Sequence, residues 1–307
     1  MDFAEYLEEL SDAARKLKVA DLQRLSNLSP EQIAQLQTAW PNTDVRRRRR
    51  IVGELVDLSE DNVDLNFLAA FTVALADSDA EVRLGAIRGL WEDESTALID
   101  PLIALADEDP DAGVRAEAAL ALGRFVLLHA LGRLRERHFE RVTAGLRRVI
   151  DKRPEVEEVR ARAIEAVGAH DASWVRQAIS EAYESGVRRL KVSAVHAMGR
   201  SAGSRWLPLL TRELNSDDAE VRYEAAVACG GVADEAAVPH LVALVDDPDA
   251  DVRAAAVAAL GDIGGMTSRN ALHDLLDNPS KATREAAAAA LAEVDFEEDP
   301  LGFRVRD

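Results

Sequence analysis

The 307-residue sequence has a single cysteine, Cys229, and no long apolar run. One thiol cannot form an intramolecular disulfide or a thiolate metal cluster, so both kinds of site are excluded. No stretch approaches the roughly 18 apolar residues that cross a bilayer. The acidic first residues, MDFAEYLEEL, lack the basic beginning and apolar stretch of a signal peptide. Together these absences predict a cytoplasmic protein without a membrane segment.

Aromatic residues and positive charges are also scarce. Aromatic side chains make up 5% of the sequence, and alanine fills many apolar positions, which suits closely packed helices better than a β-sandwich. The 37 lysine and arginine residues are outnumbered by 56 aspartate and glutamate residues, which gives a net charge of −19. Such a charge argues against a general affinity for nucleic acid or an anionic membrane, so neither is an expected partner.

A basic residue recurs along the chain with a spacing that settles at 31 residues. These anchors are Arg83, Arg115, Arg160, Lys191, Arg222, Arg253 and Arg284. An alanine stands three positions after each anchor, and apolar residues stand one position before and seven positions after nearly all of them. Because these offsets lie on one helical face, each anchor belongs to an amphipathic helix. A second apolar-periodic segment follows each one, so the repeat is predicted to be a pair of helices.

Recurring residues also predict where the first helix of each pair begins and ends. Good N-cap residues such as Asp109 and Asp247 stand six positions before most anchors, and Pro110 and Pro248 follow these two. Glycines eight positions after the anchors are expected to end the helices, at Gly123, Gly168, Gly199, Gly230 and Gly261.

The runs DAEVRYEAAVACG (218–230) and DADVRAAAVAALG (249–261) resemble short HEAT-like repeats of the phycobilisome-lyase type. The resemblance covers about residues 76–292 and implies an all-α solenoid in which the second helices line the concave face. It also implies a ladder in which the anchors pair with acids of neighbouring repeats, here Asp79, Asp111, Asp218 and Asp249. Glu155 and Glu157 are the candidates to replace the acid that is missing before Arg160.

These patterns divide the chain into three parts. Residues 1–40 are predicted to form a helical cap on the first repeat, because terminal repeats need covering. Residues 41–294 are predicted to form the solenoid, with about seven repeats and a terminal half repeat. One anchor spacing is 45 residues, which marks an insertion near residues 124–153. The acidic tail, residues 295–307, is expected to be flexible.

Positive charge is concentrated in two segments. The insertion carries nine basic and three acidic residues, a net charge of +6, and residues 41–50 carry five arginines and one aspartate, a net charge of +4. Four arginines of the insertion fall near one helical face: Arg133, Arg137, Arg141 and Arg148. We interpret this face as solvated arginines paired with nearby acids. The alternative is a docking site for an acidic partner surface, a phosphate group or nucleic acid.

No motif predicts catalysis, and no cofactor is expected. The run GRSAG at 199–203 matches the G-x-S-x-G pattern of hydrolases, but that motif needs a preceding strand, and here it joins two helices. The six histidines lack H-x-x-x-H spacing and none precedes a glutamate, which argues against a two-iron hydroxylase. Cys229 stands where other repeats have leucine, so it is predicted to be a core thiol.

The concave row expected on the second helices is small, mixed and nearly neutral. Its predicted partner contacts are Gln177, Leu209, Arg212 and His240. A protein partner fits such a row better than a DNA backbone, which requires a basic groove. The leading hypothesis is therefore a non-catalytic scaffold or adaptor that binds a protein. The alternatives are a tetrapyrrole lyase-like enzyme, implied by the resemblance alone, and nucleic-acid binding through the arginine-rich segments.

Overall fold

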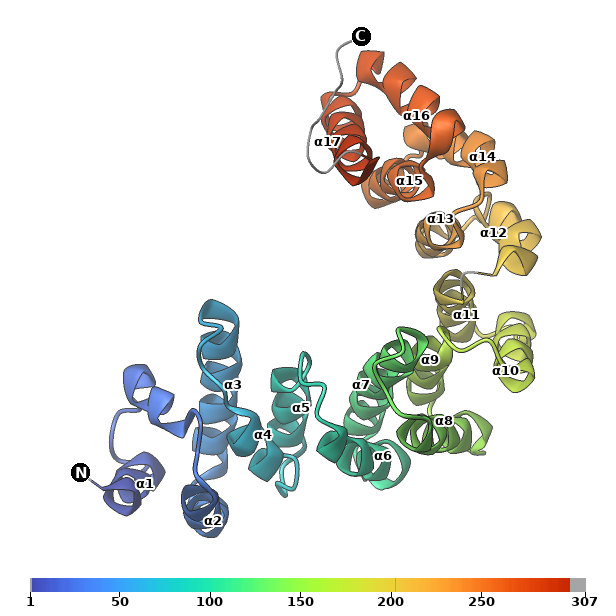
Figure 1. Ribbon diagram of the computed structural model, residues 1–307. Helices are drawn as coiled ribbons and strands as arrows, with labels where there is room; N and C mark the ends of the chain where they lie inside the picture. The colour runs from blue at the N-terminus through green and yellow to red at the C-terminus, as the bar shows by residue number, and fades with distance from the viewer. Residues whose placement is uncertain (1, 202, 299–307) are drawn as a thin grey trace. The chain divides into compact units, whose positions relative to one another are not determined.

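The structure, a computed structural model, describes residues 2–201 and 203–298 (Figure 1). All regular elements in these residues are helical, and the helices alternate between two layers, so the predicted all-α solenoid is confirmed. Within the same residues no helix is both long and apolar enough to cross a membrane.

The anchor residues lie on the first helix of each pair. The first helices are α3 (Val45–Asp61), α5 (Ala80–Gly89), α7 (Ala112–Ala130), α9 (Glu157–Val167), α11 (Arg188–Arg200), α13 (Ala219–Val232), α15 (Ala250–Ile263) and α17 (Lys281–Glu298). The second helices are α4 (Leu68–Ala74), α6 (Ile99–Glu108), α8 (Glu136–Asp151), α10 (Ser173–Glu184), α12 (Leu207–Glu213), α14 (Val238–Ala243) and α16 (Gly265–Asp274). Several second helices are extended by short 3₁₀ turns, at Thr96–Leu98, Ser204–Trp206, Glu235–Ala237, Leu244–Asp246 and Leu275–Asp277.

The segment before α3 contains α1 (Phe3–Ser11), a 3₁₀ turn (Val19–Leu25), α2 (Pro30–Ala39) and a second 3₁₀ turn (Trp40–Asn42). Ser29 caps α2, and the side chain of Gln32 bonds back to the Ser29 amide. The segment is attached to α3 by Arg47, whose guanidinium donates to the backbone oxygens of Leu10 and Arg15. The residues of the predicted cap therefore pack directly against the first pair of helices.

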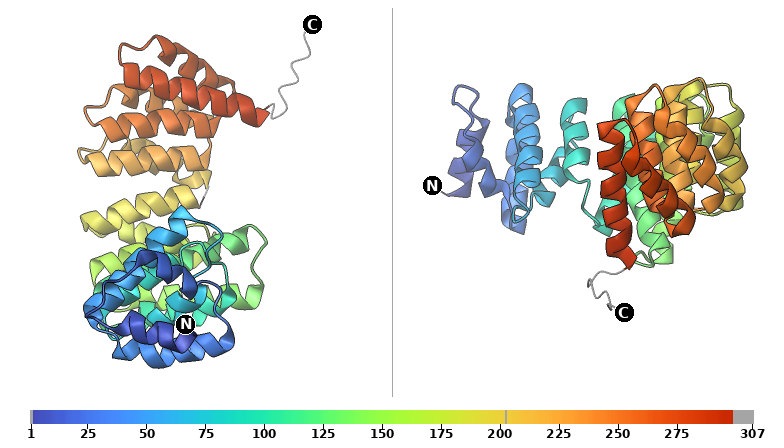
Figure 2. Two further views of the ribbon diagram at one scale, coloured as in Figure 1. Left: turned by 90° about the vertical axis from the view of Figure 1, so that its left-hand side faces the viewer. Right: turned by 90° about the horizontal axis from the view of Figure 1, so that it is seen from above.

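Close contacts divide the chain into two compact units, residues 1–163 and 164–307, and the division falls within α9. The first unit contains the predicted cap with α3 to α8, and the second contains α10 to α17. The left view of Figure 2 shows the helices of the second unit as stacked, roughly parallel rods. Because α17 continues to Glu298, residues 295–298 of the expected tail are helical, and residues 299–307 lie outside the described residues.

The first helices begin three residues before their anchors, so their N-caps stand four positions before them. The N-cap residues are Asp79, Asp111, Asp218 and Asp249, and each side chain accepts a hydrogen bond from an amide in the first turn. The prediction of caps six positions before the anchors is wrong, and Pro110 and Pro248 consequently precede the helices. The aspartates at that earlier position have a different task, because they bind the anchor of the preceding repeat.

These aspartates form a ladder between repeats. Arg83 donates to both carboxylate oxygens of Asp109, each at 2.7 Å, and to the backbone oxygen of Asp77, also at 2.7 Å. The predicted ladder therefore exists, but its acids do not stand four positions before the anchors. Glu155 replaces the missing acid, as predicted. The rungs are Arg48–Asp77, Arg83–Asp109, Arg115–Glu155, Lys191–Glu213 and Arg222–Asp247.

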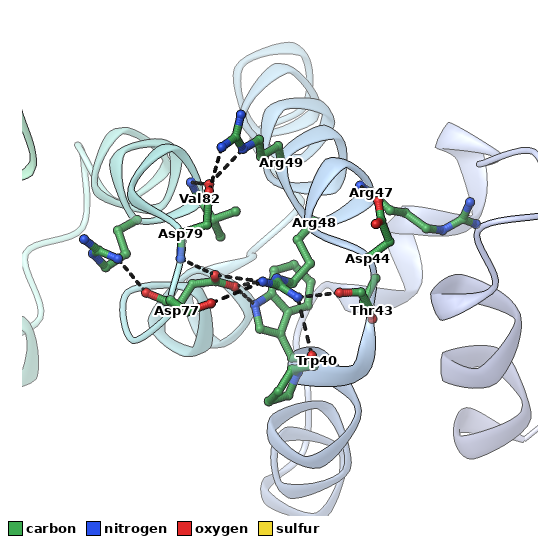
Figure 3. A network of polar contacts seen from close by, with 12 residues as sticks. Trp40, Thr43, Asp44, Arg47, Arg48, Arg49, Asp77, Asp79 and Val82 are labelled. Carbon is green, nitrogen blue, oxygen red and sulfur yellow. Dashed lines mark hydrogen bonds and ion pairs between the residues drawn. The ribbon is translucent and has the colours of Figure 1, made fainter. Parts of the chain in front are cut away.

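The first rung also joins the N-terminal segment to the repeats (Figure 3). Asp77 accepts a hydrogen bond from Nε1 of Trp40 at 2.7 Å and a second from the guanidinium of Arg48. The same guanidinium donates to the backbone oxygen of Thr43. Because the side chains of Arg48 and Asp77 are only 8% and 2% exposed, the pair lies out of contact with water. Trp40, at the end of the predicted cap, is thus held by the ladder.

The glycines eight positions after the anchors have a packing role. Gly168 follows the end of α9, but Gly123, Gly199, Gly230 and Gly261 lie inside helices, so the prediction that they end them is wrong. A Cβ at Gly199 would lie 2.5 Å from the Cα of Ala228, and one at Gly230 would lie 3.1 Å from the Cα of Ala259. A side chain at Gly199 would therefore clash with the backbone of the next first helix, and at Gly230 the contact is close enough that the next helix would have to shift.

The predicted insertion lengthens an existing pair of helices. α7 has 19 residues and α8 has 16, compared with 10 residues in each of α5 and α6. The added turns bury Phe125 and Val126 of α7, and α8 buries Leu146 and Val149 along its apolar face. The insertion consequently enlarges the core of the first unit.

Candidate partner-binding surface

In the unit of residues 164–307 the first helices pack more closely than the second helices. Glycine meets alanine between α11 and α13 and again between α13 and α15, so the backbones there are almost in contact. The second helices α12 and α14 barely touch. A two-layered array bends toward its more closely spaced layer, and Figure 1 shows α11, α13, α15 and α17 on the inner side of this unit. The expectation that the second helices line the concave side is therefore wrong here.

The inner surface of α13 and α15 is hollowed and partly apolar. Tyr223 and Val227 of α13 are 38% and 40% exposed, and Ala254 and Ala258 of α15 are exposed as well. These four side chains line a groove of about 610 Å³. A second hollow of about 290 Å³ lies over alanines of α15 and α17. Apolar surface thus extends over three successive first helices.

Acidic side chains accompany this apolar surface. Glu220, Asp249 and Asp251 line the groove, and Asp262 and Glu293 line the second hollow. Residues 219–293 contain thirteen acidic and five basic residues, which gives a net charge of −8. The segment that carries the inner surface is therefore acidic as a whole, and five of its acids line the two hollows beside the exposed apolar side chains.

The five basic residues of this segment are bound to other groups. Arg222, Arg253 and Arg284 are anchors of the repeat, and each donates to a backbone oxygen six positions earlier at 2.6–2.8 Å. Arg269 pairs with Asp295 at 3.3 Å, and Lys281 pairs with Glu285 at 3.2 Å. The ion pairs of Arg269 and Lys281 do not involve Asp249 or Asp251 of the groove.

Positive charge on the inner side is concentrated on α11 and is paired with α13. Arg188 binds Asp218 and also Glu220, the latter at 2.6 Å. The hydrogen bond from Arg188 holds the pKa of the Asp218 carboxyl below its ordinary value. Nδ1 of His196 lies 3.1 Å from the carboxylate of Glu224. The acids nearest α11 are thus partly compensated, whereas Asp251 of α15 and Glu293 of α17 form no ion pair with a basic side chain of the described residues.

Comparison with known proteins identifies the repeat. A sequence profile of HEAT repeats matches residues 68–168, 177–260 and 239–300, which is more than half of the chain. The chain belongs to the HEAT repeat family. None of the curated proteins matches the sequence of this HEAT repeat protein.

Two solved structures have a similar fold. A chain of the complex of CpcE and CpcF of phycocyanin lyase from Nostoc sp. PCC7120 is 18% identical, with a TM-score of 0.53, over 92% of this chain and 97% of that one. A chain from a structure of Kap95p binding to RanGDP is 13% identical, with a TM-score of 0.55, over 96% of this chain and 45% of that one. The HEAT repeat protein thus spans less than half of the second chain. At these identities the likeness concerns the fold alone.

Four of the sequence-predicted contacts lie on second helices of the HEAT array. Gln177 and His240, on α10 and α14, are exposed, and Leu209 on α12 is half-buried. Arg212, also on α12, donates to the phenol oxygen of Tyr183. The structure therefore places these residues on the outer row, away from the groove of α13 and α15. Their role in partner binding stays a prediction.

The arginines of the insertion pair with acids of the preceding HEAT repeat. The pairs are Arg133–Glu94, Arg141–Asp100 and Arg148–Asp107. These contacts confirm the interpretation of solvated, paired arginines at three positions. Arg137 is exposed, and its Nε lies 3.1 Å from Nε2 of His138. Docking of a partner by Arg133, Arg137 and Arg141 stays a prediction, and it would have to compete with the existing pairs.

The residues considered as candidates for catalysis or metal binding are part of the helical scaffold. Cys229 is fully buried, and burial raises the pKa of its thiol to about 12, so the prediction of a core thiol is confirmed. Gly199 and Arg200 of the GRSAG run are the last two residues of α11, and a 3₁₀ turn begins at Ser204, so no strand precedes the serine as a hydrolase nucleophile requires. Among the described residues no cluster of three histidine, cysteine or acidic side chains could hold a metal ion.

Sequence reasoning overlooked the inner residues Tyr223, Val227, Ala254 and Ala258. They stand one and five positions after their anchors, on the first helices, whereas the partner contacts were predicted on the second helices. A signal for them exists in the repeat itself. The position after the anchor is leucine, alanine, valine, tyrosine or glutamate in different repeats, whereas the position three after it is always alanine. Variation beside a constant position indicates that the variable position is not fixed by the helix-to-helix contact, although it is buried in α7, α9 and α11, at Ala116, Ala161 and Val192.

Proposed function

We propose that this HEAT repeat protein is a non-catalytic scaffold that binds a partner protein on the inner surface of α13, α15 and α17. The observation that carries the proposal is the exposed aromatic and aliphatic surface of Tyr223 and Val227 beside the alanines of α15. Apolar surface bordered by charge is typical of protein interfaces, where tyrosine often supplies much of the binding energy. The groove is open and lined mainly by short side chains, so it would leave a small ligand largely in water.

The positions of the arginines favour a protein partner over nucleic acid. In the segment 41–50, Arg47, Arg48 and Arg49 already bind backbone oxygens or carboxylates of the protein itself. Three arginines of the insertion are paired with acids in the same way. Phosphate groups would have to displace these partners, and the negatively charged inner surface would repel them.

The environment of Cys229 argues against a lyase-like reaction through a thiol. Nucleophilic attack requires the thiolate, and a thiol whose pKa is raised by burial is almost entirely protonated near neutral pH. The enzymatic alternative then rests on the resemblance of the repeats alone, and repeats of one fold serve unrelated functions.

Photo-crosslinking in native cells tests the proposed function. A benzophenone amino acid is placed at position 223 in one variant and at position 240 in a matched control, so that the label lies on the inner or the outer row. We expect irradiation to link a partner protein at position 223 and not at position 240. Links at position 240 alone would support the second-helix contacts Gln177, Leu209 and Arg212 instead. Absence of a protein adduct at both positions would contradict the scaffold function.

A further inference from the structure

We propose that the partner segment bound by this inner surface is a basic amphipathic helix. The inference rests on the proposed protein-binding function and adds the chemistry of the partner. It is derived from the charge of the surface, from its exposed apolar side chains and from the hydrogen-bonding groups that α13, α15 and α17 offer to a ligand.

The charge of the surface selects a positive partner. Asp251 lines the groove and Glu293 the second hollow, and no basic side chain of the described residues forms an ion pair with either. Opposite charges on the partner would relieve the repulsion among these acids and would steer the two molecules together. Lysine or arginine on the partner is therefore required near the N-terminus of α15 and near the C-terminal half of α17.

The apolar part of the surface selects a segment with its own apolar face. Tyr223 and Val227 project from α13, while the surfaces of α15 and α17 beside them consist largely of alanine: Ala254, Ala258, Ala286 and Ala289. Alanine allows a partner's larger side chains to approach the helix backbones closely. A leucine or phenylalanine side chain that entered the groove would be buried against these alanines and the Tyr223 ring, which favours binding.

The lack of side-chain amides on these three helices favours a helical partner over an extended chain. An extended peptide on an apolar surface must find partners for its backbone N–H and C=O groups, since an unpaired buried group is costly. The sequences of α13, α15 and α17 contain no asparagine or glutamine that could bond to both. A helix bonds its own backbone internally, so it can lie on such a surface without these partners.

Selection from a peptide library tests the inference with the full chain. The library presents helical peptides of about 20 residues with randomised surface positions, because this length suffices for several turns. We expect the enriched peptides to carry a net positive charge with apolar residues three and four positions apart, and to gain helical circular dichroism on binding. Asp251→Lys is expected to weaken their binding by about tenfold, more at low salt than at high salt.

The matched control is Asp274→Lys, which makes the same charge change at an exposed position on α16, in the outer row. This variant should bind the enriched peptides within about twofold of the original chain, since it adds no repulsion at the groove. Enriched peptides that are neutral or acidic, that bind without forming a helix, or that respond equally to both variants would overturn the inference. Failure to enrich any peptide would overturn it as well.

The two proposals can fail separately. A protein adduct at position 223 together with non-basic selected peptides would leave the scaffold function intact and would reject the basic helix. If a basic helical peptide bound the groove but no cellular adduct formed at position 223 or 240, the preference of the surface for a basic helix would stand. The scaffold function would then be rejected.

Discussion

At the scale of single residues, the spacing of the first helices depends on glycine and alanine meeting between neighbours. Gly199 approaches Ala228 so closely that an added Cβ would lie 2.5 Å from its Cα and 2.7 Å from its Cβ. Ala228 lies in a helix backbone, so it cannot rotate away as the end of a long side chain can. A single methyl group at this position must separate two helices.

We predict that Gly199→Ala lowers the free energy of unfolding by about 1–3 kcal/mol, because overpacking forces the backbones apart. The control is Gly53→Ala in α3, where nothing lies within 4 Å of the added Cβ. That substitution should raise stability by up to about 1 kcal/mol through the better helix propensity of alanine. Urea unfolding followed by circular dichroism measures both. If Gly199→Ala instead raised the stability and Gly53→Ala lowered it, the helices would not be in contact at Gly199.

Burial predicts the reactivity of Cys229. The thiol is inaccessible and protonated near neutral pH, so in the folded chain it should react with a disulfide reagent such as DTNB at least about a hundred times more slowly than a free thiol. Addition of urea should restore the full rate. The measurement is the absorbance of released thionitrobenzoate at pH 8, and rapid reaction without urea would contradict a core position for this thiol.

At the scale of elements, the ladder fixes how one repeat follows the next. Arg83 reaches forward to the carboxylate of Asp109 and, at the same time, to the backbone oxygen of Asp77 in its own loop. One guanidinium thus holds two interhelical loops at a defined separation. The side chains are 8% and 3% exposed, so loss of either partner leaves a charge buried without compensation.

Asp109→Ala should therefore lower the free energy of unfolding by about 3 kcal/mol, since a buried charge loses its partner. Asp100→Ala provides the comparison, because Asp100 is exposed and its pair with Arg141 lies at the surface. That change should cost less than about 1 kcal/mol, as is typical of surface ion pairs. Thermal unfolding of the two variants distinguishes the cases, and similar losses in both would show that the ladder is not a buried interaction.

At the scale of the whole molecule, several carboxylates contribute stability that depends on pH. The hydrogen bond from Arg222 lowers the pKa of Asp247. Burial opposes ionisation of Glu213, but hydrogen bonds from Lys191 and Tyr183 outweigh it, and the pKa of that carboxyl is also lowered. A lowered folded-state pKa gives stability above the ordinary carboxyl value of about 4, and this stability is lost as the pH falls through the folded value.

We predict that the melting temperature decreases when the pH is lowered below about 4. We also predict that Asp247→Asn is less stable than the original chain by about 2 kcal/mol at pH 7. The difference between the two proteins should begin to shrink as the pH falls below about 4, because the carboxylate then binds a proton more readily in the unfolded chain than in the folded one, where its pKa is lowered. Scanning calorimetry from pH 3 to pH 7 measures both trends. A constant difference over this range would mean that the charge of Asp247 does not stabilise the fold.

Much of the fold could be predicted from the sequence because the repeated residues act within one helix or between adjacent helices. The anchors, the alanine three positions later and the apolar flanks each reflect one helix and its immediate contacts, so the helix pairs could be predicted. The resemblance to HEAT-like repeats implied a ladder, and the burial of Cys229 follows from the apolar residues at the same position in other repeats. Arginine pairing in the insertion was predictable because acids are abundant in the preceding repeat.

The errors have a common physical cause, since they concern distances between neighbouring repeats. Aspartates four and six positions before an anchor are equally suited to capping, and only the position of the preceding arginine decides that the earlier one is a ladder rung. A glycine that follows an apolar-periodic segment suggests a C-terminal helix cap, and only the structure shows that the next helix contacts this glycine. The predicted contacts Gln177, Leu209, Arg212 and His240 depended on the second helices forming the inner side.

The sequence by itself determined that the chain is a repeated array of helix pairs with a surplus of negative charge. Periodicity and composition are properties of the chain, so they need no knowledge of packing. Only the tertiary structure decided which row is on the inside, because curvature is a difference between two interhelical spacings. In residues 164–307 the contacts between glycine and alanine bring the first helices close together, which places these helices on the inner side. Tyr223 and Val227 therefore lie on the surface where we expect a partner to bind.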